Sequence, residues 1–354
     1  MVHNLLPDIE AAAKVVEALM ECGPSYSEIS RRTGVPIPTV RYILRKRLPR
    51  LGFTIAIAIN HGVLGLQRYM VILESHLSPR YMSGLLSMFG ELFYLRYYTY
   101  LMKERKFLTI FTVPPRYSDD FLAFLDSLKS TRIIDDYSVK KLLYMRILPF
   151  RVNSFDFKRG VWKQNWFENK FSVPEIYEDV NPSSKIDKID LLILKELEKD
   201  AFIKYIDLAR KLKLTRQTVK RHFEHIAKAI YMYTVMWVPR WNPDLVSAPI
   251  LIKTSDAESA RPSIINVPFT YAEIRTADEE YLGLALAPSM GLYKMIKYIS
   301  ERVKIECLDF LDIENALSFT VPHNLFNERI GWLNPYELGI EKIMEKIRLF
   351  GGRV

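Results

Sequence analysis

The chain has 354 residues, 49% of them hydrophobic and 26% charged, a composition that excludes a disordered chain. No apolar run is long enough to span a membrane, no secretory signal pattern begins the chain, and Cys22 and Cys307 form no disulfide framework or metal-ligand spacing. We therefore expect a cytoplasmic protein with no membrane partner. The net charge of +9 suits a polyanionic partner, but its distribution is more informative than its size.

The positive charge is concentrated in two short segments. Residues 25–50 contain seven basic residues against one acidic residue, and residues 204–228 contain eight against two, so each segment carries +6. The summed charge of the two segments exceeds the net charge of the whole chain, so the rest of the chain carries a net charge close to −3. The excess basicity therefore belongs to two local surfaces.

These two segments align with each other without a gap at an offset of 179 residues. Glu28–Arg32 matches Asp207–Lys211, and Thr39–Arg41 matches Thr218–Lys220, so acidic, apolar and basic positions coincide. With two copies and so long a period, the pattern indicates a tandem domain duplication rather than a solenoid.

Each basic segment has the pattern of a helix-turn-helix preceded by an apolar helix. In the first copy the second helix is capped by Ser25 or Ser27 and ends before Gly34. The third helix begins around Pro38 in the first copy and after the N-cap Thr215 in the second. In a helix-turn-helix domain this third helix enters the major groove of DNA.

A strand-and-helix pattern follows each helix-turn-helix. In the first copy it predicts strands at 68–75, 92–102, 106–113 and 139–148, with helices at 79–89 and 117–128. In the second copy it predicts strands at 249–254, 270–275, 281–287 and 307–319, with helices at 258–265 and 292–303. Pro262 is expected to shorten or distort the first of these helices. The β-α-β-β-α-β order is that of a ferredoxin-like sandwich.

The predicted fold class is therefore α+β, with two winged helix-turn-helix domains alternating with two ferredoxin-like domains. The apolar stretches 53–60 and 231–238 occupy the place of wings, although packing explains their character equally well. The predicted domains are the helix-turn-helix units 1–60 and 186–240, the sandwiches 61–169 and 241–334, a linker at 170–185, and a C-terminal helix or tail at 335–354.

The order of elements resembles the Lrp/AsnC family of bacterial and archaeal regulators. The resemblance is strongest at Asp187, Asp190, Leu194 and Leu197, continuing with Leu208-Ala209-Arg210 and Thr215-x-x-Thr-Val. It implies sequence-specific binding of double-stranded DNA, transcription regulation, pairing through the sandwich and, with the Lys/Arg/Ile-rich composition, an archaeal source. A small-molecule effector is compatible with the family but unsupported here, because the turns at 101–105 and 277–280 lack glycine.

The predicted DNA-binding residues lie on the second and third helices of the two copies. Arg and Lys contact phosphates or guanine edges, and Gln can pair with adenine. The set consists of Arg31, Arg32, Pro38, Thr39, Arg41, Tyr42, Arg45, Lys46, Lys213, Thr215, Arg216, Gln217, Lys220 and Arg221.

An aromatic run at 93–100 predicts an interface. Because a strand alternates its faces, one set of rings lies against the helices and the other needs a second cover. We expect Tyr94, Tyr97 and Tyr100 to pack against the second sandwich or a partner chain, giving an intrachain pseudo-dimer or a homodimer. The alternative is a row of solvent-facing tyrosines.

The sequence contains no catalytic or metal-binding motif of the familiar kinds. His222 and His225 have a spacing compatible with a metal, but no third ligand is evident nearby, and their place on a basic helix favours DNA or solvent. The sequence therefore predicts no catalytic residue, no metal, no cofactor and no enzymatic activity.

Two other functions remain open. Some tetrapyrrole decarboxylases resemble Lrp/AsnC proteins and use the sandwich as a pocket, where histidine and arginine would be expected to bind propionate groups. Both predicted sandwiches are poor in histidine: His76 is the only one within residues 68–148 and 249–319, which argues against this function. The other alternative is a protein-interaction scaffold with a degenerate helix-turn-helix.

Overall fold

The structure is a computed structural model that describes residues 7–168, 170–180, 185–238, 249–289, 291–337, 341–342 and 345. Residues 181–184 of the predicted linker and most of the predicted C-terminal helix or tail lie outside the described residues. None of the helices within these ranges is long and apolar enough to cross a membrane.

The first helix-turn-helix, called head one, contains α1 (Pro7–Cys22), α2 (Tyr26–Thr33) and α3 (Ile37–Tyr42). The Ser25 hydroxyl accepts a hydrogen bond from the Glu28 N–H at 3.3 Å and begins α2, and Gly34 ends it with φ 71°. The third helix continues through a π-helical turn (Ile43–Arg47) into α4 (Leu48–Arg50).

The second helix-turn-helix, called head two, contains α7 (Lys188–Lys199), α8 (Tyr205–Leu212) and α9 (Arg216–Ile226). As predicted, Thr215 caps α9, because its hydroxyl accepts a hydrogen bond from the Thr218 N–H at 3.1 Å.

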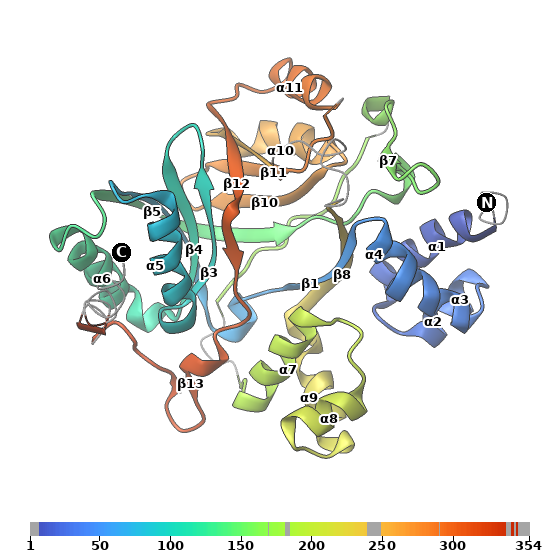
Figure 1. Ribbon diagram of the computed structural model, residues 1–354, viewed down its shortest axis with the longest axis horizontal. Coiled ribbons are helices and arrows are strands. Elements are labelled where there is room, and N and C mark those ends of the chain that lie inside the picture. Colours follow the sequence, from blue (N-terminus) through green and yellow to red (C-terminus); the bar gives the residue numbers. More distant parts are fainter. Residues whose placement is uncertain are drawn as a thin grey trace.

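The two strands expected as wings pair with each other instead. β1 (Phe53–Ile59) and β8 (Ile230–Trp237) form an antiparallel ribbon in which Phe53 lies opposite Trp237. The ribbon joins the two heads beside the barrel (Figure 1). Each strand buries part of its apolar side chains, including Phe53 and Ile57–Ile59 of β1 and Val235 and Trp237 of β8, so packing accounts for their apolar character.

Both ferredoxin-like units are present. The first contains β2 (Gln67–Glu74), α5 (Pro79–Leu92), β3 (Leu95–Leu101), β4 (Lys106–Val113), α6 (Ser118–Ser130) and β5 (Asp136–Ile147). The second contains β9 (Ile250–Thr254), α10 (Ala257–Asn266), β10 (Thr270–Thr276), β11 (Tyr281–Ala285), α11 (Leu292–Ser300) and β12 (Cys307–Ser318). The expected disruption by Pro262 does not occur: α10 continues across it, because Ala260 and Ile264 are buried on either side. The fold class is as predicted.

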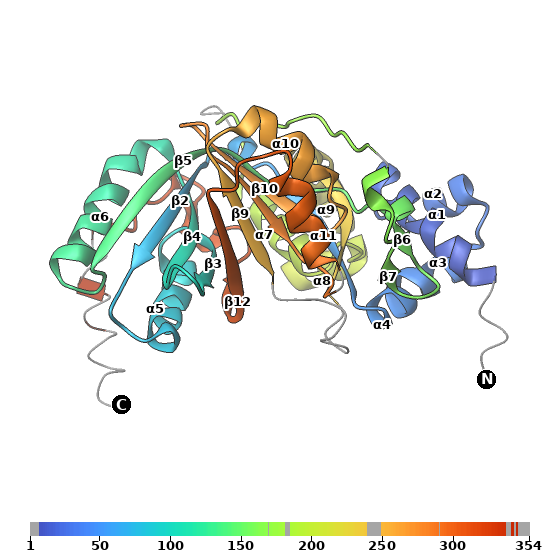
Figure 2. The same cartoon turned by 90° about the horizontal axis from the view of Figure 1, so that it is seen from above.

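The two sheets close into one barrel with the strand order β10-β11-β9-β12-β3-β4-β2-β5. The edge strands are β3 and β5 in the first sheet and β10 and β12 in the second. β5 pairs with β10 and β3 pairs with β12, so neither sheet has an open edge. Apolar side chains from both halves, including Met70, Leu108, Ile274 and Leu282, fill the interior. The helices lie outside the barrel (Figures 1 and 2). The sandwiches therefore pair within one chain.

Two short hairpins end the two sandwiches: β6 (Phe155–Asp156) with β7 (Val161–Trp162), and β13 (Phe326–Asn327) with β14 (Gly331–Trp332). Their equivalent positions extend the internal repeat to the end of each unit.

The predicted tyrosine interface is divided into three different contacts. Tyr97 lies between the two sheets, against the apolar side chains of the barrel interior. Tyr100 packs against Phe107, with ring centroids 5.0 Å apart. Tyr94 precedes β3 and its hydroxyl donates to the Leu333 carbonyl at 2.7 Å. The three rings therefore do not share one sheet face, since alternation and the turn before β3 direct them apart, and a common tyrosine interface stays a prediction.

Candidate active site between the ribbon and the barrel

A cavity of about 460 Å³ lies between the β1–β8 ribbon and the barrel. Apolar side chains of β1 and of the barrel form part of its wall. Its titratable lining residues come from both halves of the chain: His61, Arg68, Arg96, Tyr97, Arg146, Glu198 and Tyr231.

Arg68, on β2, is buried and makes two kinds of contact. Its Nη2 and Nε atoms donate to the Glu178 carboxylate at 3.0 and 2.5 Å. Glu178 lies on the segment before head two, which passes so close to the turn after β1 that a Cβ on Gly62 would lie 2.3 Å from the Asp179 carbonyl oxygen. The same Arg68 Nη2 approaches His61 Nδ1 at 2.7 Å.

The Arg68 contact determines the tautomer of His61. His61 Nδ1 also lies 3.2 Å from the Ile59 carbonyl oxygen, but the arginine is closer and can only donate, so we assign Nδ1 as the acceptor and place the proton of the neutral ring on Nε2. Burial, with Arg68 and Arg96 nearby, holds the pKa of His61 well below its usual value, so the ring is neutral at neutral pH. Within the described residues, the buried Nε2 atom has no hydrogen-bond partner.

Arg96, on β3, joins the barrel to head two. Its Nη2 pairs with Glu198 Oε1 of α7 at 2.6 Å, and its Nη1 donates to the Phe319 carbonyl oxygen. Burial lowers the pKa of Arg96. Its Nε atom is buried and lacks a partner in the described part of the chain.

Arg146, on β5, belongs to a larger buried network. Its Nε pairs with Glu273 of β10, and its Nη1 donates to the Pro174 carbonyl oxygen at 2.6 Å. Glu273 also accepts from Arg261 Nε at 2.9 Å and from the Tyr281 hydroxyl at 2.6 Å. The Nη2 atom of Arg146 has no partner among the described residues.

The lining residues therefore carry three buried donors that find no acceptor in the described part of the chain: His61 Nε2, Arg96 Nε and Arg146 Nη2. Buried polar atoms are usually hydrogen-bonded, since an unpaired one costs free energy. Each of these three donor atoms needs an oxygen that accepts a hydrogen bond. A molecule with several carboxylates supplies such oxygens.

Two phenols complete the polar lining. Burial raises the pKa of Tyr97 to about 12, so its hydroxyl stays protonated and can donate. The Tyr231 hydroxyl accepts a hydrogen bond from the Ile147 N–H at 3.2 Å, which fixes the ring between the ribbon and β5.

The predicted DNA-binding residues lie elsewhere, and none of them lines this cavity. In head two, Arg216, Gln217, Lys220 and Arg221 are exposed on α9, as are Lys213 and Thr215 before it. In head one, Pro38, Tyr42 and Lys46 are exposed and Thr39 is half-buried.

Several basic residues of head one are already paired. Arg31 and Arg32 both donate to the Glu28 carboxylate. Arg41 lies over the Tyr26 ring, at 5.3 Å from its centroid. Arg45 pairs with Asp200 of head two at 2.9 Å, beside a stacked contact between Tyr26 and Phe202 at 4.9 Å. The first recognition helix therefore faces the second head, and Arg45 is not a free surface cation.

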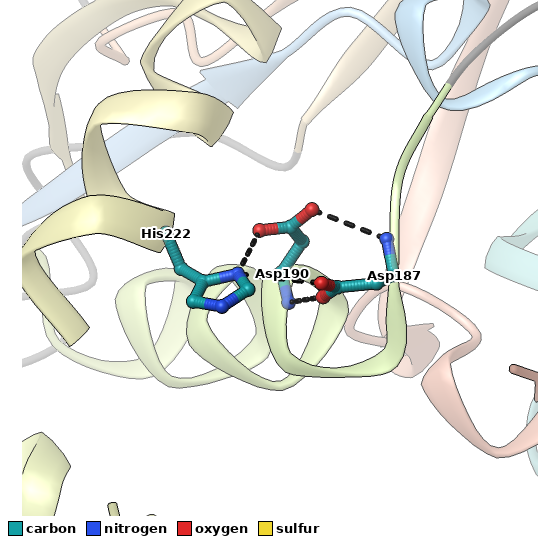
Figure 3. A group of neighbouring side chains, drawn as sticks. All are labelled: Asp187, Asp190 and His222. Atoms are coloured by element: carbon teal, nitrogen blue, oxygen red, sulfur yellow. Dashed lines mark hydrogen bonds and ion pairs between the residues drawn. The ribbon is translucent and has the colours of Figure 1, made fainter. Parts of the chain in front are cut away.

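The expectation for His222 is wrong. Its side chain is buried and its Nδ1 lies 2.8 Å from Asp190 Oδ1, so it faces the core of head two rather than DNA or solvent (Figure 3). Asp187 and Asp190 are the additional potential ligands that were not recognised in the sequence.

The sequence did not reveal the cavity residues, because histidines were considered only within residues 68–148 and 249–319. His76 is exposed and pairs with Asp135, whereas His61 lies just after β1 and was left out of the count. A better signal was that Arg96 and Arg146 each lie between two apolar or aromatic residues of a strand, since a buried charge requires a partner or a ligand.

Residues 186–225 match the family model for winged helix-turn-helix DNA-binding domains. The curated proteins gave no sequence match. Two solved structures that resemble the whole chain are both of the siroheme decarboxylase NirDL. One has a TM-score of 0.55 and 9% identity, covering 95% of this chain and 99% of that chain. The other, in co-complex with an iron-uroporphyrin III analogue, has a TM-score of 0.54 and 8% identity over 96% and 99%.

AsnC of E. coli matches 38% of this chain and 91% of its own, with 16% identity and a TM-score of 0.29. The comparisons bear out the winged helix-turn-helix in head two, and they give no support for an archaeal source. At such low identities the likeness to NirDL shows the fold. The prediction that the chain is not an enzyme is contradicted, because the solved structures that match it from end to end are those of a decarboxylase.

Proposed function

We propose that the chain is a decarboxylase that binds a carboxylate-bearing tetrapyrrole in the cavity between the β1–β8 ribbon and the barrel. The observation that carries the proposal is the lining itself: three arginines, of which Arg68 and Arg146 are buried, and a neutral histidine, with three buried donor atoms that lack an acceptor among the described residues. The end-to-end likeness to a siroheme decarboxylase, one structure of which holds an iron-uroporphyrin III analogue, supports the same ligand class.

Different parts of the cavity suit different parts of such a reaction. Arg68, Arg96 and Arg146 bind and orient the carboxylates that do not react. The apolar wall, which includes Ile57 and Ile110, excludes water from the reacting carboxylate. A desolvated carboxylate is less stable, which favours its loss as CO₂.

Decarboxylation breaks the bond between carbon and the carboxylate, releases CO₂ and leaves the electron pair on carbon. That carbon then needs a proton. Tyr97 lines the cavity and stays protonated, so we assign it the proton-donating role, whereas the neutral His61 supplies a hydrogen bond through Nε2.

Anaerobic titration with iron-uroporphyrin III tests the binding step. We expect a saturable change in the Soret absorption with one macrocycle per chain, because one chain supplies the lining of this cavity. A macrocycle of the same ring size without carboxylates is the matched control and should not bind. Absence of saturable binding, or equal binding of both macrocycles, would contradict the proposal.

DNA binding by head two is a second candidate function, favoured by its family match and by the exposed basic residues of α9. We expect duplex binding in a mobility shift assay, with log affinity falling by about 0.9 per phosphate contact for each unit of log salt. Replacing Arg216, Lys220 and Arg221 by alanine should weaken binding and reduce that slope.

The control for the DNA experiment is Lys294→Ala/Lys297→Ala on α11, which removes exposed positive charge away from the heads. It should leave binding unchanged. Equal losses in both variants would mean that the chain attracts DNA through its net charge, and no binding at low salt would remove this function.

A further inference from the structure

A cluster of carboxylates and histidines, in which Asp190 and His222 are buried, joins the first and third helices of head two (Figure 3). Asp190 Oδ1 lies 2.8 Å from His222 Nδ1, and Asp190 Oδ2 lies 2.7 Å from His225 Nδ1. Asp187 Oδ2 is 3.5 Å from the same His222 nitrogen. One ligand atom from each of Asp187, Asp190 and His222 lies within 4.8 Å of the other two.

Local helix chemistry places these groups together. Asp187 is the N-cap of α7 and Asp190 is three residues later, and each accepts a hydrogen bond from the other's N–H, at 2.9 and 3.1 Å. On α9, His222 follows Val219 by three residues and shares its inward face, and His225 is on the next turn. The carboxylates and imidazoles therefore meet where α7 and α9 pack.

The internal repeat shows that the fold does not require this polar cluster. The buried positions of the first helices of the two heads can be matched: Val15, Val16 and Leu19 of α1 correspond to Ile193, Leu194 and Leu197 of α7. In this match, Ala12 occupies the position of Asp190. Ile43 occupies the position of His222 at the offset of 179. Ala12 and Ile43 are both fully buried, so the same helix contact is apolar in head one.

Burying the Asp190 carboxylate costs free energy, and head one shows that an apolar pair can form the same helix contact. This difference indicates that the cluster in head two serves to bind a ligand. We propose that Asp187, Asp190, His222 and His225 bind one divalent transition-metal ion of the Zn²⁺ class. Imidazole nitrogen with carboxylate oxygen is a ligand set for such ions, and two carboxylates balance the charge of the dication.

The ion would take the place of the two protons that now join the imidazoles to Asp190. Ligand atoms at hydrogen-bond distance need to separate only slightly to surround a metal at about 2.0–2.2 Å from each. It would tie the start of α7 to α9 and so hold the exposed recognition helix of head two in place. This site is independent of the proposed decarboxylase cavity, since none of its residues lines that cavity.

Metal binding by the full-length, metal-stripped chain tests the proposal, with Zn²⁺ and Co²⁺ as probes. We expect one equivalent of Zn²⁺ after dialysis, a Co²⁺ complex with the intense visible absorption of low coordination number, and a rise in Tm with Zn²⁺. Affinity should fall as the pH is lowered, because protons compete for the imidazoles.

Two variants test the assignment of the ligands. His222→Asn/His225→Asn keeps amide donors toward Asp190 but removes both imidazoles, and Asp187→Asn keeps an equally good N-cap but removes one charged ligand. We expect the first to lose the site and the second to bind at least about tenfold more weakly. His76→Asn is the control, since His76 forms a similar pair with Asp135 at 2.7 Å on the surface and should be dispensable.

The proposal is overturned if the wild-type chain retains no Zn²⁺, or if the double histidine variant retains as much as wild type. A loss of metal in His76→Asn alone would also overturn it. If the double variant does not fold, the Co²⁺ spectra of wild type and Asp187→Asn decide the question.

Discussion

Replacing Arg146 by glutamine is expected to weaken binding of a carboxylate-bearing tetrapyrrole about 10- to 100-fold, the loss that follows from removing a hydrogen bond between charged groups. The fold should tolerate the change, because Glu273 keeps Arg261 and Tyr281 as partners. Arg96→Gln should have a similar effect on affinity, since Glu198 still accepts from the Val321 N–H at 2.7 Å. Macrocycle titration of both variants measures the effect.

Arg275→Gln is the matched control for these variants. Arg275 is also buried and ion-paired on a barrel strand, with Glu175 at 3.0 Å, but it does not line the cavity. It should lower stability without changing the affinity for the macrocycle. If Arg275→Gln weakens binding as much as Arg146→Gln does, the arginines act through the stability of the barrel and not through the ligand.

Glu273→Ala is expected to destabilise the protein by about 3–5 kcal/mol, the cost of removing one partner from a buried ion pair. Glu273 is fully buried and is shared by Arg146, Arg261 and Tyr281. Its loss leaves the buried Arg146 without its carboxylate, whereas Arg261 is partly exposed and keeps Glu175 at 3.7 Å. Because Glu273 bridges β5 of the first sandwich and β10 of the second, the loss should open the barrel where the two halves meet. The shift of the urea denaturation midpoint measures it.

Asp278→Ala is the control for that experiment. Asp278 also pairs across the two halves, with Lys140, but its side chain is 54% exposed, so we expect a change below about 1 kcal/mol. Equal destabilisation by the two variants would mean that burial of Glu273 has no special role in closing the barrel.

The element order could be predicted because it depends on local patterns. The strands and helices of both sandwiches lie within a few residues of their expected positions, and the repeat at an offset of 179 identified the second copy. What the sequence left open was the pairing of the sheets within one chain or between two chains. Edge strands are equally able to pair in either way, and only the three-dimensional arrangement shows β5 beside β10 and β12 beside β3.

The cavity could not be predicted from any one segment. Arg96 and Arg146 come from the first sandwich, whereas Glu198, which pairs with Arg96, comes from head two. These residues meet because the barrel closes and the ribbon crosses beside it, both of which are long-range events. His222 was predictable in principle: its three-residue spacing from Val219 places it on the buried face of α9, but the basic character of the helix obscured that pattern.

The most direct test of the proposed function is a single-turnover reaction of the anaerobic wild-type chain with siroheme, analysed by mass spectrometry of the tetrapyrrole. We predict a product lighter by the mass of CO₂ for each carboxylate removed, and little or none of it with Arg146→Gln. Siroheme recovered unchanged after binding, or conversion that does not depend on Arg146, would contradict the assignment of this cavity as the active site.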